Sequence, residues 1–93
     1  MKLSLINKHA IVCGSTDGIG KASALLLAKQ GCEITLVARN QDKLDKTQSE
    51  LNTNHNQKHY SVCADFDNSL DLKNKIKMHI DSLGRSVDVL VNN

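Results

Sequence analysis

The chain has 93 residues, a formal net charge of +2 and 40% hydrophobic residues. This length fits one small domain or part of a larger one, and the apolar content is sufficient for a folded core. Basic and acidic residues are mixed along the chain, whereas a nucleic-acid-binding protein would carry a basic stripe of one sign. No apolar run is long enough for a signal peptide or a membrane span, so we predict a cytoplasmic protein without membrane or nucleic-acid partners.

The three cysteines are far apart in the sequence and form no C-x-x-C pair. Neither they nor the four histidines have the spacing of metal ligands, so we predict no metal site. An odd number of cysteines without a secretion signal indicates reduced, buried thiols. Cys13 precedes a glycine-rich segment, and we interpret it as an inert thiol at a strand end rather than a catalytic nucleophile.

Apolar patterning predicts four strands that alternate with three helices. Short apolar and β-branched runs indicate strands over residues 8–13, 33–38, 59–64 and 87–91. Helical spacing indicates helices over 18–30, from the cap Asn40 to about 51, and from a cap at Asp67 or Asn68 to 83. Gly31 and Gly84 follow the first and third helices and are suited to end them.

The last predicted helix is amphipathic. Its apolar stripe contains Leu72, Ile76, Ile80 and Leu83. The basic residues on or beside this helix are interpreted as its solvated face: Lys73, Lys75, Lys77 and Arg85.

The order β-α-β-α-β-α-β with short connections predicts an α/β fold with a parallel sheet. In a dinucleotide-binding arrangement of the Rossmann type, a doubly wound sheet, the strand order is 3-2-1-4. Ligands bind such sheets at the carboxyl ends of the strands, near the switch point between strands 1 and 4. The four expected strand ends are all polar or glycine-rich, as a binding site requires.

A glycine-rich segment follows the first predicted strand and opens the first helix. Its glycines have the spacing G-x-x-x-G-x-G. Glycine permits a close approach of phosphate, and the helix N-terminus attracts the anion. The Ser15 and Thr16 hydroxyls either bond phosphate or close the turn internally. The predicted cofactor-binding residues of this segment are Gly14, Ser15, Thr16, Asp17, Gly18, Ile19 and Gly20.

Arg39 follows the second predicted strand, where an NAD site usually has an acidic residue that binds the adenosine ribose. Ala38 cannot accept those hydrogen bonds, whereas a guanidinium suits the 2′-phosphate of NADP. The sequence therefore favours NADP over NAD. The alternative is a solvated surface arginine. Asn40 could support the same phosphate, although its main role is expected to be the helix cap.

Polar residues also follow the third and fourth predicted strands. Asp65 can accept a hydrogen bond from the adenine amino group while Phe66 flanks the ring; alternatively, Asp65 is a loop residue that caps the next helix. Asn92 and Asn93 can tie neighbouring loops together under the nicotinamide ribose, or they form a simple turn. All four are predicted cofactor-binding residues.

These motifs, in this order, resemble the short-chain dehydrogenase/reductase family. The family's T-G-x-x-x-G-x-G loop corresponds to Cys13 through Gly20, with Cys13 in place of the usual Thr. Its basic residue after strand 2 corresponds to Arg39, its acidic residue after strand 3 to Asp65, and its N-N-A-G motif begins at Asn92. The sequence is most similar to the single-domain reductases of this family, including 3-oxoacyl-carrier-protein reductases.

The resemblance implies an NADP-dependent oxidoreductase that passes hydride to a carbonyl or removes it from an alcohol. It further implies a small carbonyl, alcohol or acyl-carrier substrate and a homodimer or homotetramer. Residues 1–93 would be the N-terminal portion of one NAD(P)-binding domain, truncated within N-N-A-G, and inactive alone.

No catalytic residue can be assigned, because the family's Ser and Tyr-x-x-x-Lys are absent; Tyr60 is followed four residues later by Ala64. The alternative is a stand-alone nucleotide-binding or protein-interaction module without catalysis. A flavodoxin-like or receiver-like domain shares the alternation but does not need this loop or Arg39.

Overall fold

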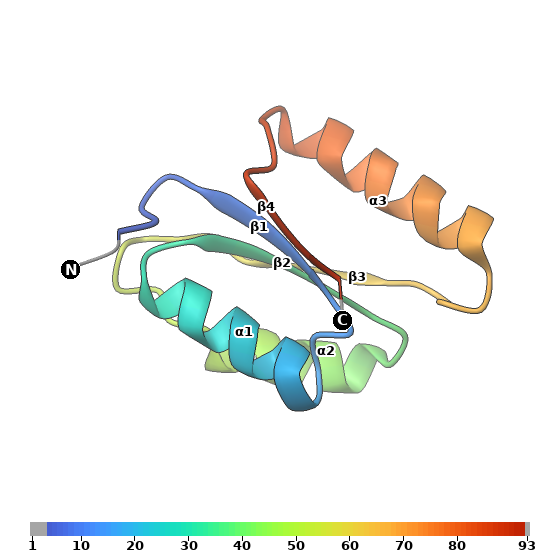
Figure 1. The fold of residues 1–93 in the computed structure, drawn as a ribbon, viewed down its shortest axis with the longest axis horizontal. Coiled ribbons are helices and arrows are strands. Elements are labelled where there is room, and N and C mark those ends of the chain that lie inside the picture. Colours follow the sequence, from blue (N-terminus) through green and yellow to red (C-terminus); the bar gives the residue numbers. More distant parts are fainter. Residues whose placement is uncertain (1–3, 93) are drawn as a thin grey trace.

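Residues 4–92, the part of the chain that the structure describes, form a sheet of four parallel strands (Figure 1). The structure is a computed structural model. The strands are β1 (His9–Cys13), β2 (Glu33–Ala38), β3 (Tyr60–Cys63) and β4 (Val89–Asn92). Their order across the sheet is β3-β2-β1-β4, and each neighbouring pair is parallel. The predicted α/β fold and strand order are therefore confirmed.

Helices cover both faces of this sheet. Within residues 4–92 they are α1 (Gly18–Lys29), α2 (Gln41–Glu50) and α3 (Ser69–Leu83). α1 and α2 lie on one face, and α3 lies on the opposite face (Figure 1). A helix that crosses a bilayer needs about 20 apolar residues, and no helix within the described range has that length and apolar character.

Side-chain caps and one left-handed glycine fix the helix ends. The Asn40 carboxamide oxygen accepts a hydrogen bond from the backbone N–H of Lys43, as predicted for the start of α2. Asn68, rather than Asp67, caps α3 by accepting from the backbone N–H of Asp71. Gly84 ends α3 with a φ of 64°, in the left-handed region that glycine adopts readily.

The apolar core has two parts, one on each face of the sheet. Every residue of β1 is buried, which is typical of a parallel strand covered on both faces. Towards α1 and α2 the core contains Ala24, Ala28, Ile34, Leu36 and Leu44. Towards α3 it contains Ile11 and Val37, against which Leu72, Ile76 and Ile80 pack. The predicted apolar stripe of the last helix therefore faces the sheet.

The fourth strand begins at Val89, two residues later than predicted. Just before it, the Asp88 carboxylate accepts a hydrogen bond from the backbone N–H of His9 at 2.9 Å. The Asp88 N–H donates to the His9 carbonyl, also at 2.9 Å. The Asp88 side chain thus replaces a backbone carbonyl as the acceptor at this end of the sheet. The regular backbone pairing of β4 with β1 therefore begins at the next residue, Val89.

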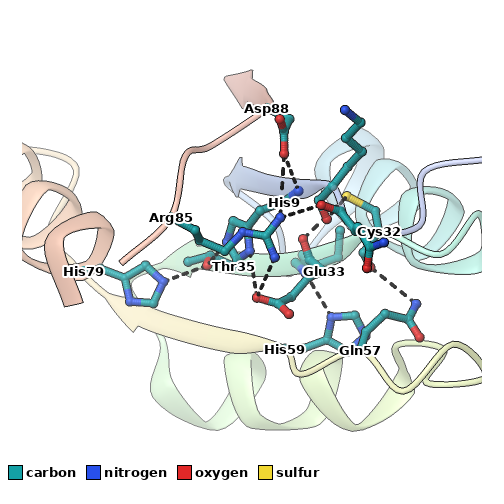
Figure 2. Close-up of polar contacts among 12 residues, drawn as sticks. His9, Cys32, Glu33, Thr35, Gln57, His59, His79, Arg85 and Asp88 are labelled. Atoms are coloured by element: carbon teal, nitrogen blue, oxygen red, sulfur yellow. Dashed lines mark hydrogen bonds and ion pairs between the residues drawn. The ribbon is translucent and has the colours of Figure 1, made fainter. Parts of the chain in front are cut away.

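A buried polar cluster lies at the amino ends of β1 and β2, with α3 beside it (Figure 2). The His9 imidazole is 3.0 Å from the Glu33 carboxylate through Nδ1 and 2.7 Å from Thr35 Oγ1 through Nε2. The same Thr35 oxygen is 2.7 Å from Nε2 of His79, a residue of α3. These contacts join two strands and a helix in one chain of hydrogen bonds.

Arg85 also belongs to this end of the sheet, which corrects its interpretation as part of a solvated helix face. Its guanidinium lies 3.9 Å from the carboxylates of both Glu33 and Asp88 and donates to the carbonyl of Asn7 (Figure 2). The residue follows α3 in sequence, yet the turn after Gly84 brings it back towards the sheet. Its positive charge is therefore balanced by two carboxylates.

Acidification below pH 6.5 is expected to lower the free energy of unfolding. The pKa values of His9 and His79 both lie below their ordinary value of 6.5, mainly because burial disfavours the charged imidazolium; Glu33 opposes this shift at His9, and His9 adds to it at His79. The unfolded chain therefore takes up more protons as the pH falls below 6.5, and the stability falls with it. Well above pH 6.5 both imidazoles are neutral in the folded and the unfolded states, and the stabilisation is complete.

Urea denaturation above and below pH 6.5 measures this effect. A His79→Gln variant should lose less stability on acidification than the wild type, whereas a variant of the exposed His55, His55→Gln, should follow the wild-type profile. Equal stability on both sides of pH 6.5 would contradict the expectation.

Candidate functional site

The glycine-rich loop turns sharply at the carboxyl end of β1. Gly14 and Gly18 both have positive φ angles, 67° and 56°, which favour glycine over residues with a Cβ. The Gly14 N–H donates to the Val37 carbonyl at 2.9 Å, and the buried Ser15 hydroxyl donates to the same oxygen at 3.4 Å. The Ser15 hydroxyl thus ties the loop to β2, and a contact of Ser15 or Thr16 with phosphate stays a prediction.

An open cleft of about 630 Å³ lies beside this loop, at the carboxyl ends of β1 and β2. A volume of this order is typical of small-molecule and cofactor sites, which are ~300–1,000 Å³. Residues from three separate segments line it: Gly14, Thr16, Asp17, Ala38, Arg39, Asn40, Lys43, Phe66 and Asp67. Six of the predicted cofactor-binding residues therefore share one cleft.

Two cations and two carboxylates set the electrostatics of the cleft. The Arg39 guanidinium is 3.7 Å from the Asp67 carboxylate, and the Lys43 ammonium is 3.3 Å from the Asp17 carboxylate. These side chains are 56–87% exposed, so the ion pairs are weak and screened by solvent. Both cations can therefore turn towards an anion in the cleft at small cost.

The N-terminus of α1 has no side-chain cap. Asp17 occupies the N-cap position, but its side chain makes no capping hydrogen bond and contacts Lys43 instead. In α2, by contrast, the Asn40 side chain accepts from the first turn. The first-turn N–H groups of α1 thus lack a side-chain acceptor, so the predicted phosphate contact at this helix end stays a prediction.

Asp65 lies in a neighbouring cavity of about 430 Å³, which shares Arg39 and Asp67 with the first cleft. Its carboxylate accepts a hydrogen bond from the backbone N–H of Asp67 at 2.9 Å, which stabilises the loop after β3. Phe66 lines the first cleft. A contact of Asp65 with adenine stays a prediction.

The remaining predicted residues are placed around the loop and the next strand. Ile19 is 74% exposed on α1, and Gly20 is buried. Asn92 ends β4 and pairs in register with Cys13, so it lies beside the start of the glycine loop. Asn93 lies outside the described residues.

Lys43 and Asp67 line the cleft but were missed by sequence reasoning, in which Asp67 figured only as a possible cap. A signal for Lys43 exists in the sequence: it lies three residues after the cap Asn40, in the first turn of α2. That turn starts at the carboxyl end of β2, the same end that carries Arg39. A basic residue at this spacing is therefore directed to the ligand-binding edge of the sheet.

Cys13 and Cys32 are buried as predicted, whereas Cys63 is only half-buried, and neither of the two buried thiols is activated as a nucleophile. Burial raises the pKa of Cys13, and burial together with nearby Asp88 raises the pKa of Cys32 to about 11. A catalytic thiol requires the opposite shift, so the inert interpretation of Cys13 agrees with its surroundings. Within residues 4–92, no group of three or more His, Cys, Asp or Glu side chains is arranged to hold a metal ion.

The arrangement of loop, sheet and helix corresponds to a known family. The family model described as short chain dehydrogenase matches residues 8–93. The chain belongs to the short-chain dehydrogenase family. This match confirms the resemblance inferred from the four motifs, and it extends over all the strands and helices described above.

Two similar proteins of this family come from Bos taurus. The very-long-chain 3-oxoacyl-CoA reductase is 42% identical over 88 residues, which are 95% of this chain and 27% of that protein. The 3-ketodihydrosphingosine reductase is 43% identical over 94 residues, which cover 97% of this chain and 28% of that protein. The chain thus spans little more than a quarter of the length of these short-chain dehydrogenases.

A solved structure of the family has the same fold. L-sorbose reductase from Gluconobacter frateurii, complexed with NADPH and L-sorbose, matches with a TM-score of 0.85 and 32% sequence identity. The match covers 100% of this chain and 35% of that one. The similarity therefore includes the glycine loop, the end of β2 and the loop after β3.

Proposed function

We propose that this chain is the cofactor-binding part of an NADP-dependent oxidoreductase that reduces carbonyl compounds or oxidises the corresponding alcohols. Membership of the short-chain dehydrogenase family supports hydride transfer, which the nicotinamide of the bound cofactor supplies. The chain itself contributes the loop, the cleft and the cations that hold the dinucleotide. No residue of this chain is proposed to take part in the proton transfer.

One observation carries the preference for NADP. Arg39 directly follows β2 and lines the cleft, at the position where Ala38 offers no carboxylate to a ribose. A guanidinium there has the opposite charge to the 2′-phosphate of NADP and offers it two parallel N–H donors. The NADPH complex of the similar L-sorbose reductase supports the same choice.

The substrate class is proposed from the relatives. The similar bovine proteins are named for 3-oxoacyl-CoA and 3-ketodihydrosphingosine, both of which carry a ketone. We therefore propose a ketone-bearing substrate. The acyl-carrier substrate predicted from the sequence is one member of this class. A cytoplasmic location and a homodimer or homotetramer stay predictions.

Arg39→Asp is expected to weaken NADPH binding by about tenfold, since a charge-assisted hydrogen bond contributes ~1.5–3 kcal/mol and exposure reduces this towards the lower end. The Arg39 side chain is 73% exposed. NADH lacks the 2′-phosphate, so its Kd should change little. Calorimetric titration of the protein with both cofactors measures the two constants.

Lys46→Asp provides the control, because Lys46 is an exposed residue of α2 that does not line the cleft. It carries the same change of charge and should leave both constants unaltered. Equal losses of NADPH and NADH affinity in Arg39→Asp would remove Arg39 from the 2′-phosphate site. Failure of the wild type to bind either cofactor would overturn the proposed function.

A further inference from the structure

Lys43 connects two parts of the cleft that are far apart in the sequence. It lies in the first turn of α2, next to the cap Asn40 and one turn from Arg39. Its ammonium is 3.3 Å from the carboxylate of Asp17, a residue of the glycine loop 26 positions earlier. Both side chains line the same cleft. The ion pair therefore joins the glycine loop to α2 beside the cleft.

The pairing of both cations with exposed carboxylates leaves them available to a ligand. Lys43 is 56% exposed and Asp17 is 77% exposed, and the Arg39–Asp67 pair is more exposed still, at 73% and 87%. An exposed ion pair is only slightly lower in free energy than the same two side chains separated and hydrated. A phosphate carries up to two negative charges and several acceptor oxygens, so it competes effectively with a single carboxylate for an ammonium.

We infer that Lys43 is a specificity-determining residue that provides a second cation, beside Arg39, for the 2′-phosphate of NADP. The inference rests on the proposed function. In the absence of cofactor, Lys43 pairs with Asp17; on binding, its ammonium moves to the phosphate. Asp17 thus opposes NADP twice, because it holds Lys43 and because its own charge repels the phosphate.

The position of Lys43 favours the 2′-phosphate over the pyrophosphate. Lys43 shares the carboxyl end of β2 with Arg39 and Asn40. The N-terminus of α1 and the glycine loop already provide N–H donors for a pyrophosphate. Because NADPH and NADH share the pyrophosphate and differ in the 2′-phosphate, the two cofactors separate these roles.

The opposite signs expected for Lys43 and Asp17 variants make the test specific. Lys43→Gln should raise the Kd for NADPH about fivefold and leave that for NADH nearly unchanged, since a single exposed charge-assisted contact is lost. Lys43→Arg should retain NADPH affinity. Asp17→Asn should lower the Kd for NADPH about two- to threefold, and Asn remains an acceptable N-cap residue.

Lys46→Gln is the matched control, because it removes the same charge from the same helix outside the cleft. Titrations of the protein with NADPH and NADH at low and high salt give the constants, and high salt should shrink the Lys43 effect. Equal NADPH affinity in Lys43→Gln and Lys46→Gln would overturn the inference, as would equal losses for both cofactors in Lys43→Gln. The proposed function would survive either result, whereas a wild type that binds neither cofactor would overturn both.

Discussion

Gly31→Ala is expected to lower the free energy of unfolding by about 2–4 kcal/mol, from left-handed backbone strain and a steric clash. Gly31 has a φ of 98°. A Cβ at this position would lie 2.7 Å from Cγ1 of Ile6 and 3.2 Å from its backbone nitrogen. The Ile6 side chain is partly exposed and can rotate, but its backbone cannot move without cost.

That backbone is held against the same turn. The N–H of Leu5 donates to the Gln30 carbonyl at 2.9 Å, and the N–H of Gly31 donates to Ala28 at 3.0 Å. The turn after α1 and the segment before β1 are thus packed together by short contacts. A methyl group between them must displace one or the other, and the segment before β1 loses its hydrogen bond.

Gly84→Ala separates strain from clash. Gly84 also has a positive φ, 64°, but a Cβ there would meet no heavy atom within 4 Å. Its cost should be limited to about 1–2 kcal/mol of strain. Urea denaturation of both variants gives the two free energies. Equal losses would show that the close approach of Ile6 contributes nothing at Gly31.

The sequence was sufficient to predict the local features of this fold. Gly31 and Gly84 were identified as helix-ending glycines because a left-handed residue after a helix has a strong local signature. β2 was predicted with the observed bounds, since its β-branched run stands between a glycine and a helix cap. The cap at Asn40 follows the same logic.

Features that depend on long-range side-chain pairing could not be predicted. The Lys43–Asp17 contact joins residues 26 positions apart, and Arg85, which follows α3, contacts the carboxylate of Glu33 in β2. No local pattern indicates such partners, because they depend on how the loops pack once the sheet has formed. The same holds for the Ser15 hydroxyl, whose acceptor, the Val37 carbonyl, lies 22 positions further along the chain.

Thr35→Val is expected to lower the free energy of unfolding by about 1–3 kcal/mol, because it leaves a buried polar atom without a partner. Thr35 is fully buried, and valine has nearly its shape. The lost group is a hydroxyl whose oxygen lies 2.7 Å from Nε2 of both His9 and His79. Since His9 is fully buried, water cannot replace the missing bond there.

The Glu33 carboxylate, which can only accept, determines the direction of the hydrogen bonds from Glu33 through His9 and Thr35 to His79. The Glu33 carboxylate accepts from the Nδ1–H of His9, so Nε2 of a neutral His9 accepts the Thr35 hydroxyl proton. The Thr35 oxygen in turn accepts from the Nε2–H of His79. In this arrangement each of the three contacts pairs one donor with one acceptor. A protonated His9 would donate through Nε2 as well, which would reverse the direction of its bond with Thr35.

Thr35→Ser distinguishes the hydroxyl from the shape of the side chain. Serine keeps the bond to both imidazoles and loses one methyl group, which costs ~1 kcal/mol. Valine keeps the volume and loses both bonds. If the hydrogen-bonded chain stabilises the amino end of the sheet, Thr35→Ser unfolds at higher urea concentration than Thr35→Val. The reverse order would mean that packing against β1 and α3, and not the bonds to His9 and His79, makes Thr35 important.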